Sequence, residues 1–355
     1  MTVSNPDQLA ADSRASTSIR PDLLGSTPRA ASDASSSNGQ TFSPDVSDAL
    51  DWQRVGRLLT RQTQKFQQLL ARVLSAEGGD AVHDLRVCTR RLQQILTVLA
   101  AGTSTRGRGL RRELRGVRAA VGNWRNCDVI LQRVERQERA ARSRTRRAGW
   151  NLLREALEQR RRRQIRRAQH KLLKPGLLAV ADSAARILAA ARTQRGAPAL
   201  RERVRMALAK AHERWQAAVA ALEQQPSDEN FHLLRIKTKS LRYRIELAGE
   251  LGLPAAAVQI AWLRGLQDRL GRWHDRRELS LSIARTLAKP KVLLAQPRLA
   301  ADLLREVERQ QRHGQAEMDR ILDQARHSPG SAALQRWIKD LSQAAPLSDQ
   351  LGDNS

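Results

Sequence analysis

The stretch VHDLRVCTRRLQQIL at residues 82–96 is matched by FHLLRIKTKSLRYRI at residues 231–245, and both contain the pattern His-x-x-Arg-x-x-x-(Arg/Lys). Corresponding residues in the two stretches are 149 positions apart. In a helix, which turns by about 100° per residue, offsets of three and seven place side chains on one face. Each stretch therefore predicts a helix with a basic face, formed by His83, Arg86 and Arg90 in the first copy and by His232, Arg235 and Lys239 in the second.

The opposite face of both predicted helices is apolar. Its residues are Leu85, Leu92, Leu96 and Leu99 in the first copy and Leu234, Leu241, Ile245 and Ala248 in the second. A helix of this kind buries its apolar side and keeps its basic side free. We therefore expect the two basic faces to lie opposite each other across a shared space that binds anions.

The repeat extends beyond these two stretches. The same offset of 149 residues relates LRG at 114–116 to LRG at 263–265, and GNW at 122–124 to GRW at 271–273. A constant offset over this length excludes insertions between the copies across several helices. Two copies are too few for a solenoid, so the sequence predicts a pair of helical bundles related by a pseudo-twofold axis.

The chain is expected to be all-α between two tails. Residues 1–45 are rich in Ser, Ala, Asp and Thr and predict a disordered N-terminal tail, and residues 344–355 form a C-terminal tail. We place the first helical repeat at 46–193 and the second at 198–343. No sustained alternation of apolar and polar residues indicates a strand. The predicted helices span 46–76, 80–101, 107–122, 127–170, 176–193, 198–224, 228–250, 254–271, 275–288, 297–327 and 330–343.

The composition indicates a polyanionic partner. The formal net charge is +27, which points to nucleic acid, an anionic membrane surface or a phosphate polymer. No run of about 18 apolar residues predicts a membrane span, and no apolar leader predicts secretion. Cys88 and Cys127 give no disulfide framework and suit a reducing compartment, so we expect a cytoplasmic protein.

The four repeated blocks together resemble the CHAD family, the conserved-histidine α-helical domains. The matching blocks are VHDLRVCTRRL and FHLLRIKTKSLRYRIEL, together with LRGVRAAVGNWRNCDVIL and LRGLQDRLGRWHDRREL. The resemblance covers roughly residues 48 to 342. It implies two four-helix bundles related by pseudo-twofold symmetry, and binding of inorganic polyphosphate through a basic groove or cavity. It also implies association with polyphosphate granules and their proteins, and no catalysis by the domain itself.

The chain departs from the family pattern after the conserved glycine. Where the family has Arg-Asp-x-Asp, this sequence reads Arg125-Asn126-Cys127-Asp128, and the second copy places His274 where the first has Arg125. The second basic helix also has Ser240 where a basic residue is common. These differences predict a stronger anion site on the first half of the chain than on the second.

Each candidate residue also has a structural interpretation. A single histidine near a helix start usually bonds locally, and arginines such as Arg242 have Glu246 on the same face as an ion-pair partner. The matched basic neighbours in both copies, and the shortage of acids, favour phosphate binding, for which the planar guanidinium of arginine is well shaped. The predicted polyphosphate-binding residues are His83, Arg86, Arg90, Arg91, Arg115, Arg118, Arg125, His232, Arg235, Lys239, Arg242, Arg264 and His274.

Three functions remain open at this point. The leading hypothesis is non-enzymatic polyphosphate binding without a cofactor or a metal ion. A nucleic-acid-binding module is the alternative, although few aromatic residues are present for base stacking. Phosphate hydrolysis or transfer requires clustered carboxylates that hold metal ions, whereas the acids of this chain, such as Asp84, Asp128 and Asp275, are isolated in sequence, so we expect no enzyme.

Overall fold

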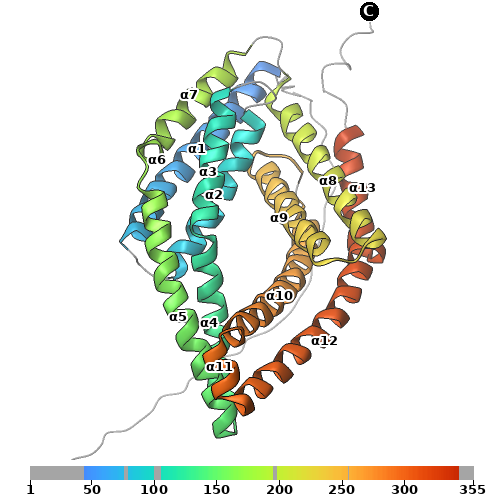
Figure 1. Cartoon of the computed structure of the whole chain (residues 1–355). Helices are drawn as coiled ribbons and strands as arrows, with labels where there is room; N and C mark the ends of the chain where they lie inside the picture. Colours follow the sequence, from blue (N-terminus) through green and yellow to red (C-terminus); the bar gives the residue numbers. More distant parts are fainter. Residues whose placement is uncertain (1–43, 76–78, 100–104, 195–197, 255, 344–355) are drawn as a thin grey trace, which may run out of the picture. The chain divides into compact units, whose positions relative to one another are not determined.

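The computed structural model describes residues 44–75, 79–99, 105–194, 198–254 and 256–343, and these residues form helices and no strand (Figure 1). The predicted all-α class is therefore confirmed. The C-terminal tail and all but the last two residues of the predicted N-terminal tail lie outside these ranges. The helices are α1 (Pro44–Leu74), α2 (Gly79–Leu99), α3 (Thr105–Ala120), α4 (Gly122–Ala140), α5 (Arg144–Leu172), α6 (Pro175–Leu178), α7 (Val180–Arg192), α8 (Leu200–Gln224), α9 (Asp228–Glu250), α10 (Ala257–Leu287), α11 (Pro290–Ala295), α12 (Pro297–His327) and α13 (Pro329–Gln343).

Several predicted helix boundaries are wrong: α4 begins at Gly122 and not at 127, the helix predicted over 176–193 is divided into α6 and α7, and α11 was not predicted. The single helix expected over 127–170 is broken between α4 and α5, where Ala141 is extended and Ser143 caps α5 by accepting a hydrogen bond from the backbone N–H of Arg146. The break expected between 271 and 275 does not occur, because α10 continues through Gly271. A glycine inside a helix costs about 1 kcal/mol, which tertiary packing readily outweighs.

Both motif helices bury the apolar stripe that the sequence predicts. Leu85, Leu92 and Leu96 on α2 are fully buried, and Leu234 and Leu241 on α9 are fully buried as well. Helix α2 packs against α1 and α3, α9 packs against α8 and α10, and α2 and α9 also contact each other. The stripes therefore fix the rotation of both helices and leave their basic faces turned away from the apolar core.

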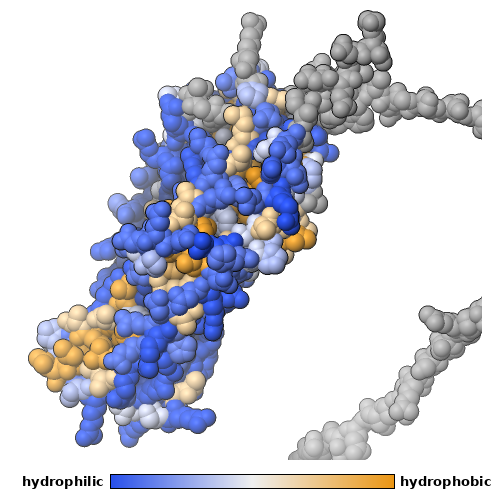
Figure 2. Space-filling view, turned by 90° about the vertical axis from the view of Figure 1, so that its right-hand side faces the viewer, coloured by the Kyte–Doolittle hydropathy of each residue, from blue (hydrophilic) through white to orange (hydrophobic). Residues whose placement is uncertain are grey.

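The apolar core does not divide at the boundary between the sequence repeats. One large cluster takes side chains from helices of both halves, from Trp52 on α1 to Leu341 on α13. A smaller cluster packs α4, α5 and α10 against one another and includes Ile130 on α4, Leu153 on α5 and Leu279 on α10. On the face shown in Figure 2, hydrophilic residues cover most of the surface, as expected when the apolar stripes of the helices face the core.

The helix order is similar in the two halves. Helices α1 and α2 begin the first half as α8 and α9 begin the second, and the starts of α7 and α13, at residues 180 and 329, are 149 positions apart. Helices α3 and α4, which adjoin at Val121, occupy the sequence positions that the continuous helix α10 occupies in the second copy. The pseudo-twofold axis and the two separate four-helix bundles stay predictions.

A pair of adjacent leucines on α9 tests the role of the stripe. Leu234 is fully buried, whereas the side chain of Leu233 is 37% exposed. We expect Leu234→Ala to lower the free energy of unfolding by about 2–5 kcal/mol, and Leu233→Ala to change it by less than about 0.5 kcal/mol. Guanidinium unfolding of both variants measures the difference, and equal losses would contradict the assigned rotation of α9.

Candidate anion-binding cavity

A cavity of about 190 Å³ lies between α2, α4, α9 and α10. In Figure 1, α2 and α4 lie on one side of this region and α9 and α10 on the other. More than half of the predicted binding residues line it. They are His83, Arg86 and Arg90 from α2, Arg125 from α4, Arg235 and Lys239 from α9, and His274 from α10. The two basic faces found in the sequence therefore meet at one space, as predicted.

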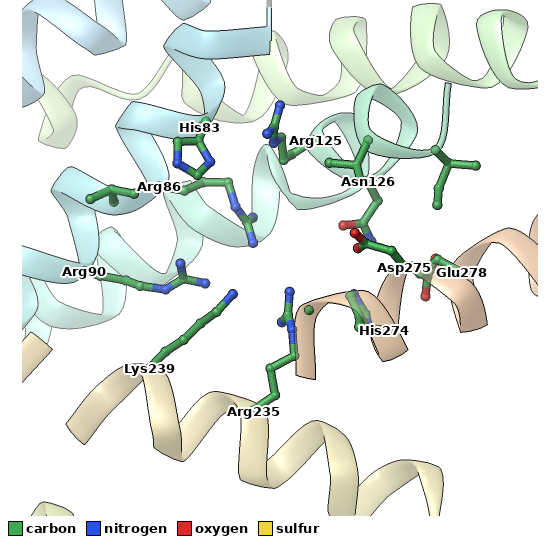
Figure 3. A pocket seen from close by; sticks show the side chains of 14 residues that line it. His83, Arg86, Arg90, Arg125, Asn126, Arg235, Lys239, His274, Asp275 and Glu278 are labelled. Atoms are coloured by element: carbon green, nitrogen blue, oxygen red, sulfur yellow. The ribbon is translucent and has the colours of Figure 1, made fainter. Parts of the chain in front are cut away.

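The cationic groups point into the same space from opposite sides (Figure 3). Arg86 and Arg90 approach from α2, whereas Arg235 and Lys239 approach from α9. Nη1 of Arg86 donates a hydrogen bond to the carbonyl oxygen of Arg118 at 2.9 Å, which fixes the direction of the guanidinium. A methyl group on residue 122 would lie 3.2 Å from the same Nη1 atom, so Gly122 leaves the room that Arg86 occupies.

These cations have little compensation from the protein. Within the described part of the chain, no carboxylate forms an ion pair with Arg86, Arg90, Arg235 or Lys239. Burial, followed by repulsion from Arg235 and Arg90, lowers the pKa of Lys239 to about 6. Burial, followed by repulsion from Arg90, lowers the pKa of Arg86 to about 10 and also lowers the pKa of Arg235. The cavity therefore concentrates positive charge that an anion would stabilise.

The histidines line the cavity or lie beside it. His83 and His232 are exposed, and burial of part of each ring, with repulsion by nearby arginines, lowers the pKa of both. His274 is less accessible, and burial followed by repulsion from Arg235 lowers its pKa to about 3. The His232 and His274 rings lie 5.7 Å apart. All three imidazoles are therefore neutral near pH 7 and offer one hydrogen-bond donor each.

Two buried polar atoms at the cavity have no hydrogen-bond partner in the described structure. They are Nε of Arg235 and Nδ1 of His274. Buried polar groups are almost always satisfied, and an unsatisfied one costs about 1–3 kcal/mol. Both residues come from the second half of the chain and line the space that the first half closes. Water or a bound anion is the partner that such groups require.

Acidic and amide groups at the cavity were missed in the sequence. Asp275 and Glu278 from α10 and Asn126 from α4 line it together with the cations. Burial raises the pKa of Asp275, and the nearby Arg235 and Arg133 act in the opposite direction. Asn126 and Asp275 are 149 positions apart and directly follow Arg125 and His274, so the repeat contained the signal. In the sequence alone, Asp275 is an isolated acid with a predicted helix break before it. In the structure, Asp275 lies on the continuous helix α10.

A second, more open hollow adjoins the cavity. The two spaces share Arg86, Asn126, Arg235, His274 and Glu278 as lining residues. His232 lines the second hollow together with Asp228 and Arg277, whose Oδ2 and Nε atoms are 2.5 Å apart. The shared lining residues give a binding surface that continues from one space into the other.

The other predicted residues lie outside the lining of the two spaces. Arg91, Arg242 and Arg264 all form ion pairs with Glu246, which is the structural interpretation that the sequence left open for Arg242. Arg118 donates a hydrogen bond from Nη1 to Gln93 and contacts Arg86 through its carbonyl oxygen. Arg115 is exposed on α3. Arg118 thus holds the lining residue Arg86 in position, whereas the ion pairs of Glu246 connect α2, α9 and α10.

The described residues hold no group of three or more His, Cys, Asp or Glu side chains arranged to bind a metal ion. None of the described helices has both the length and the apolar character that crossing a lipid bilayer requires.

The fold and the cavity together define an all-helical protein with an internal cationic site. The family model for the CHAD domain matches residues 57–284, well over half of the chain. The chain therefore belongs to the CHAD domain family, a family associated with polyphosphate binding.

Two solved structures share the fold. The crystal structure of the CHAD domain from the plant Ricinus communis is 20% identical with a TM-score of 0.61, and the match covers 79% of this chain and 92% of that chain. PptA from Streptomyces chartreusis is 22% identical with a TM-score of 0.56, covering 76% of this chain and 99% of that chain. No curated protein matches the sequence.

The charge of the cavity predicts how stability depends on pH. The pKa of Lys239 is about 6 in the folded chain, whereas it is about 10.4 in an unfolded one. The unfolded chain therefore binds more protons between these values, and the free energy of unfolding should rise with pH from about pH 6.5 to about pH 9. Guanidinium unfolding at low ionic strength measures this slope.

Lys239→Met is the matched variant, because it removes the titrating group and keeps most of the side-chain volume. We expect it to flatten the slope and to raise the stability near neutral pH. An unchanged slope in Lys239→Met would show that the pH dependence originates elsewhere.

Proposed function

We propose that this protein binds inorganic polyphosphate in the cavity between α2, α4, α9 and α10 and does not act as an enzyme. The observation that carries the proposal is the group of Arg86, Arg90, Arg235 and Lys239, which converges from two helices without ion-pairing carboxylates in the described structure. Repulsion within this group destabilises the protein when no ligand is bound. A bound polyanion attracts the same groups, so their electrostatic energy becomes favourable. Membership of a family associated with polyphosphate binding supports the same conclusion.

Phosphate oxygens suit the donors that the cavity presents. Each guanidinium offers a planar fork for bidentate contact with a phosphate group, and Lys239 adds a compact donor between two arginines. The neutral imidazole of His83 supplies a further N–H group at the rim. Partial burial strengthens these contacts because the local dielectric is lower than that of water.

A chain of phosphates fits the arrangement better than a single phosphate group. The second hollow continues from the cavity across a wall that includes Arg86 and Arg235, so these two side chains contact both spaces. A linear polyanion that passes this wall engages both spaces at once, and the second contact is intramolecular once the first has formed. The net charge of +27 attracts the chain from a distance. The attraction of this basic protein for polyphosphate supports a location at polyphosphate granules in the cytoplasm.

The acids in the cavity are poorly placed for phosphate hydrolysis. Asp275 and Glu278 lie on one helix, and Asp275 is close to Arg235 and Arg133. Phosphoryl transfer requires groups that position a nucleophile and usually carboxylates that hold metal ions, whereas these side chains face cations. The cavity therefore serves to hold phosphate groups and not to cleave the bonds between them.

Replacement of cavity arginines tests the location of binding. We expect Arg86→Gln/Arg90→Gln to weaken polyphosphate binding at least roughly ten-fold, because two charge-assisted contacts are lost. The matched control is Arg163→Gln/Arg167→Gln, which removes the same charge from exposed positions on α5 and should weaken binding much less. Fluorescence titration at several salt concentrations measures both variants, and far-UV circular dichroism monitors their folding.

Equal losses in the two double variants would refute a site in the cavity and would favour non-specific attraction by the surface. In the same titrations, duplex DNA at matched phosphate concentration should compete less well than polyphosphate. Equal competition would support the nucleic-acid alternative. Release of phosphate from polyphosphate in the presence of Mg²⁺ would contradict the non-enzymatic part of the proposal.

The acid in the cavity gives a prediction of opposite sign. Asp275→Asn removes a negative charge beside the proposed ligand and copies Asn126, which stands at the same place in the first repeat. We expect polyphosphate to bind several-fold more tightly, since like-charge repulsion across a partly buried site costs about 1 kcal/mol or more. Asp268→Asn, at an exposed position on the same helix, is the control. Unchanged or weaker binding by Asp275→Asn would place the ligand away from α10.

A further inference from the structure

Lys239 differs from the other lysines whose side chains are described. It lines the cationic cavity, whereas the half-buried Lys237 lies outside its lining and the others are exposed, namely Lys65, Lys171, Lys174, Lys210, Lys289 and Lys339. Figure 3 shows its amine between Arg90 and Arg235. Its position on α9 is fixed by the buried Leu234 and Leu241 on the opposite face.

The surroundings keep this amine unprotonated. Burial and repulsion from Arg235, Arg90 and Arg86 lower the pKa of Lys239 to about 6, and Asp275 acts against them. His83, His274 and Arg125 also line the space, and Glu278 is a second acidic residue in its lining. At pH 7.5 an exposed lysine is neutral in roughly one molecule in a thousand, whereas most of the Lys239 amines are neutral. Lys239 is therefore a nucleophile inside a site that attracts anions.

We propose that Lys239 is a site of acylation by small acyl phosphates, which the cationic cavity binds through their phosphate group. Arg86, Arg90 and Arg235 hold the phosphate, which brings the adjoining carbonyl carbon next to the Lys239 amine. No other described lysine lines this cavity. The ligand is defined by its chemistry, namely a mixed anhydride of a carboxylic acid and phosphoric acid.

The reaction is balanced without an oxidant or a further reactant. The lone pair of Nζ attacks the carbonyl carbon and forms a C–N bond, while the bond between that carbon and the phosphate oxygen breaks. The phosphate leaves with the electron pair, and the amine gives up one proton to it or to water. The products are an amide on Lys239 and inorganic phosphate. The three arginines stabilise the charge that develops on the leaving phosphate.

Acylation would regulate the polyphosphate site, and this consequence rests on the proposed function. The amide keeps a single N–H donor where the neutral amine has two, so a bound polyphosphate loses one of its contacts with Lys239. The acyl group also occupies part of a cavity of about 190 Å³. We expect Lys239→Gln, which imitates the amide, to bind polyphosphate roughly ten-fold more weakly than Lys239→Arg.

Acetyl phosphate and the full chain provide the test. After incubation near pH 7.5, peptide mass spectrometry measures the rate of acetylation at Lys239, Lys210 and Lys339. We expect Lys239 to react at least roughly ten-fold faster than the two exposed lysines, because its neutral fraction is far larger. The N-hydroxysuccinimide ester of acetic acid, an acyl donor without phosphate, is the control reagent. The preference for Lys239 should be smaller with the ester, and inorganic phosphate should suppress the reaction of acetyl phosphate at Lys239 relative to Lys210.

Two results would overturn the acylation site. One is a rate at Lys239 no higher than at Lys210 and Lys339. The other is an equal preference for Lys239 with both reagents, which would show that the cavity does not deliver the phosphate. Polyphosphate titration of the unmodified chain separates this inference from the proposed function. Selective acetylation without polyphosphate binding would refute the function and support the acylation site, whereas binding without selective acetylation would overturn the acylation site alone.

Discussion

The enclosure of like charges between α2 and α9 is the constraint on which the rest of the structure depends. Arg86, Arg90, Arg235 and Lys239 are held close together without an ion-pairing carboxylate in the described part of the chain. Their burial and mutual repulsion oppose folding, and both lower the pKa of Lys239. The fold withstands this repulsion because each motif helix buries a full apolar stripe against its neighbours. Burial of each such leucine contributes about 1.5–3 kcal/mol.

The same arrangement gives the site its chemistry. The donors are partly buried and held in position before a ligand binds. The hydrogen bond from Arg86 to the Arg118 carbonyl is an example. An anion then gains contacts without reorganising the protein. A short distance from the cavity along α9, Glu246 pairs with Arg91, Arg242 and Arg264. The contrast between the paired and the unpaired arginines distinguishes the structural cluster from the candidate binding site.

The first and second halves of the chain contribute unequal walls. The first half supplies Arg125 and Asn126 from α4, whereas the second supplies His274 and Asp275 from α10 at the corresponding sequence positions. The acid and the poorly protonated imidazole make the α10 wall less favourable to phosphate. The expectation from the sequence, that the first half holds the stronger part of the site, stays a prediction.

The sequence by itself determined the helical class, the buried stripes and the basic faces of α2 and α9, because these follow from the 3.6-residue period within one helix. It also indicated Arg125 on α4 and His274 on α10 through the repeat. Only the tertiary structure decided which cations meet: it turned Arg86 and Lys239 into one space and brought Arg91, Arg242 and Arg264 to Glu246. It also placed Asp275 among the cations, because α10 runs without a break. Such choices depend on how separate helices pack, and the local periodicity of a single helix does not contain that information.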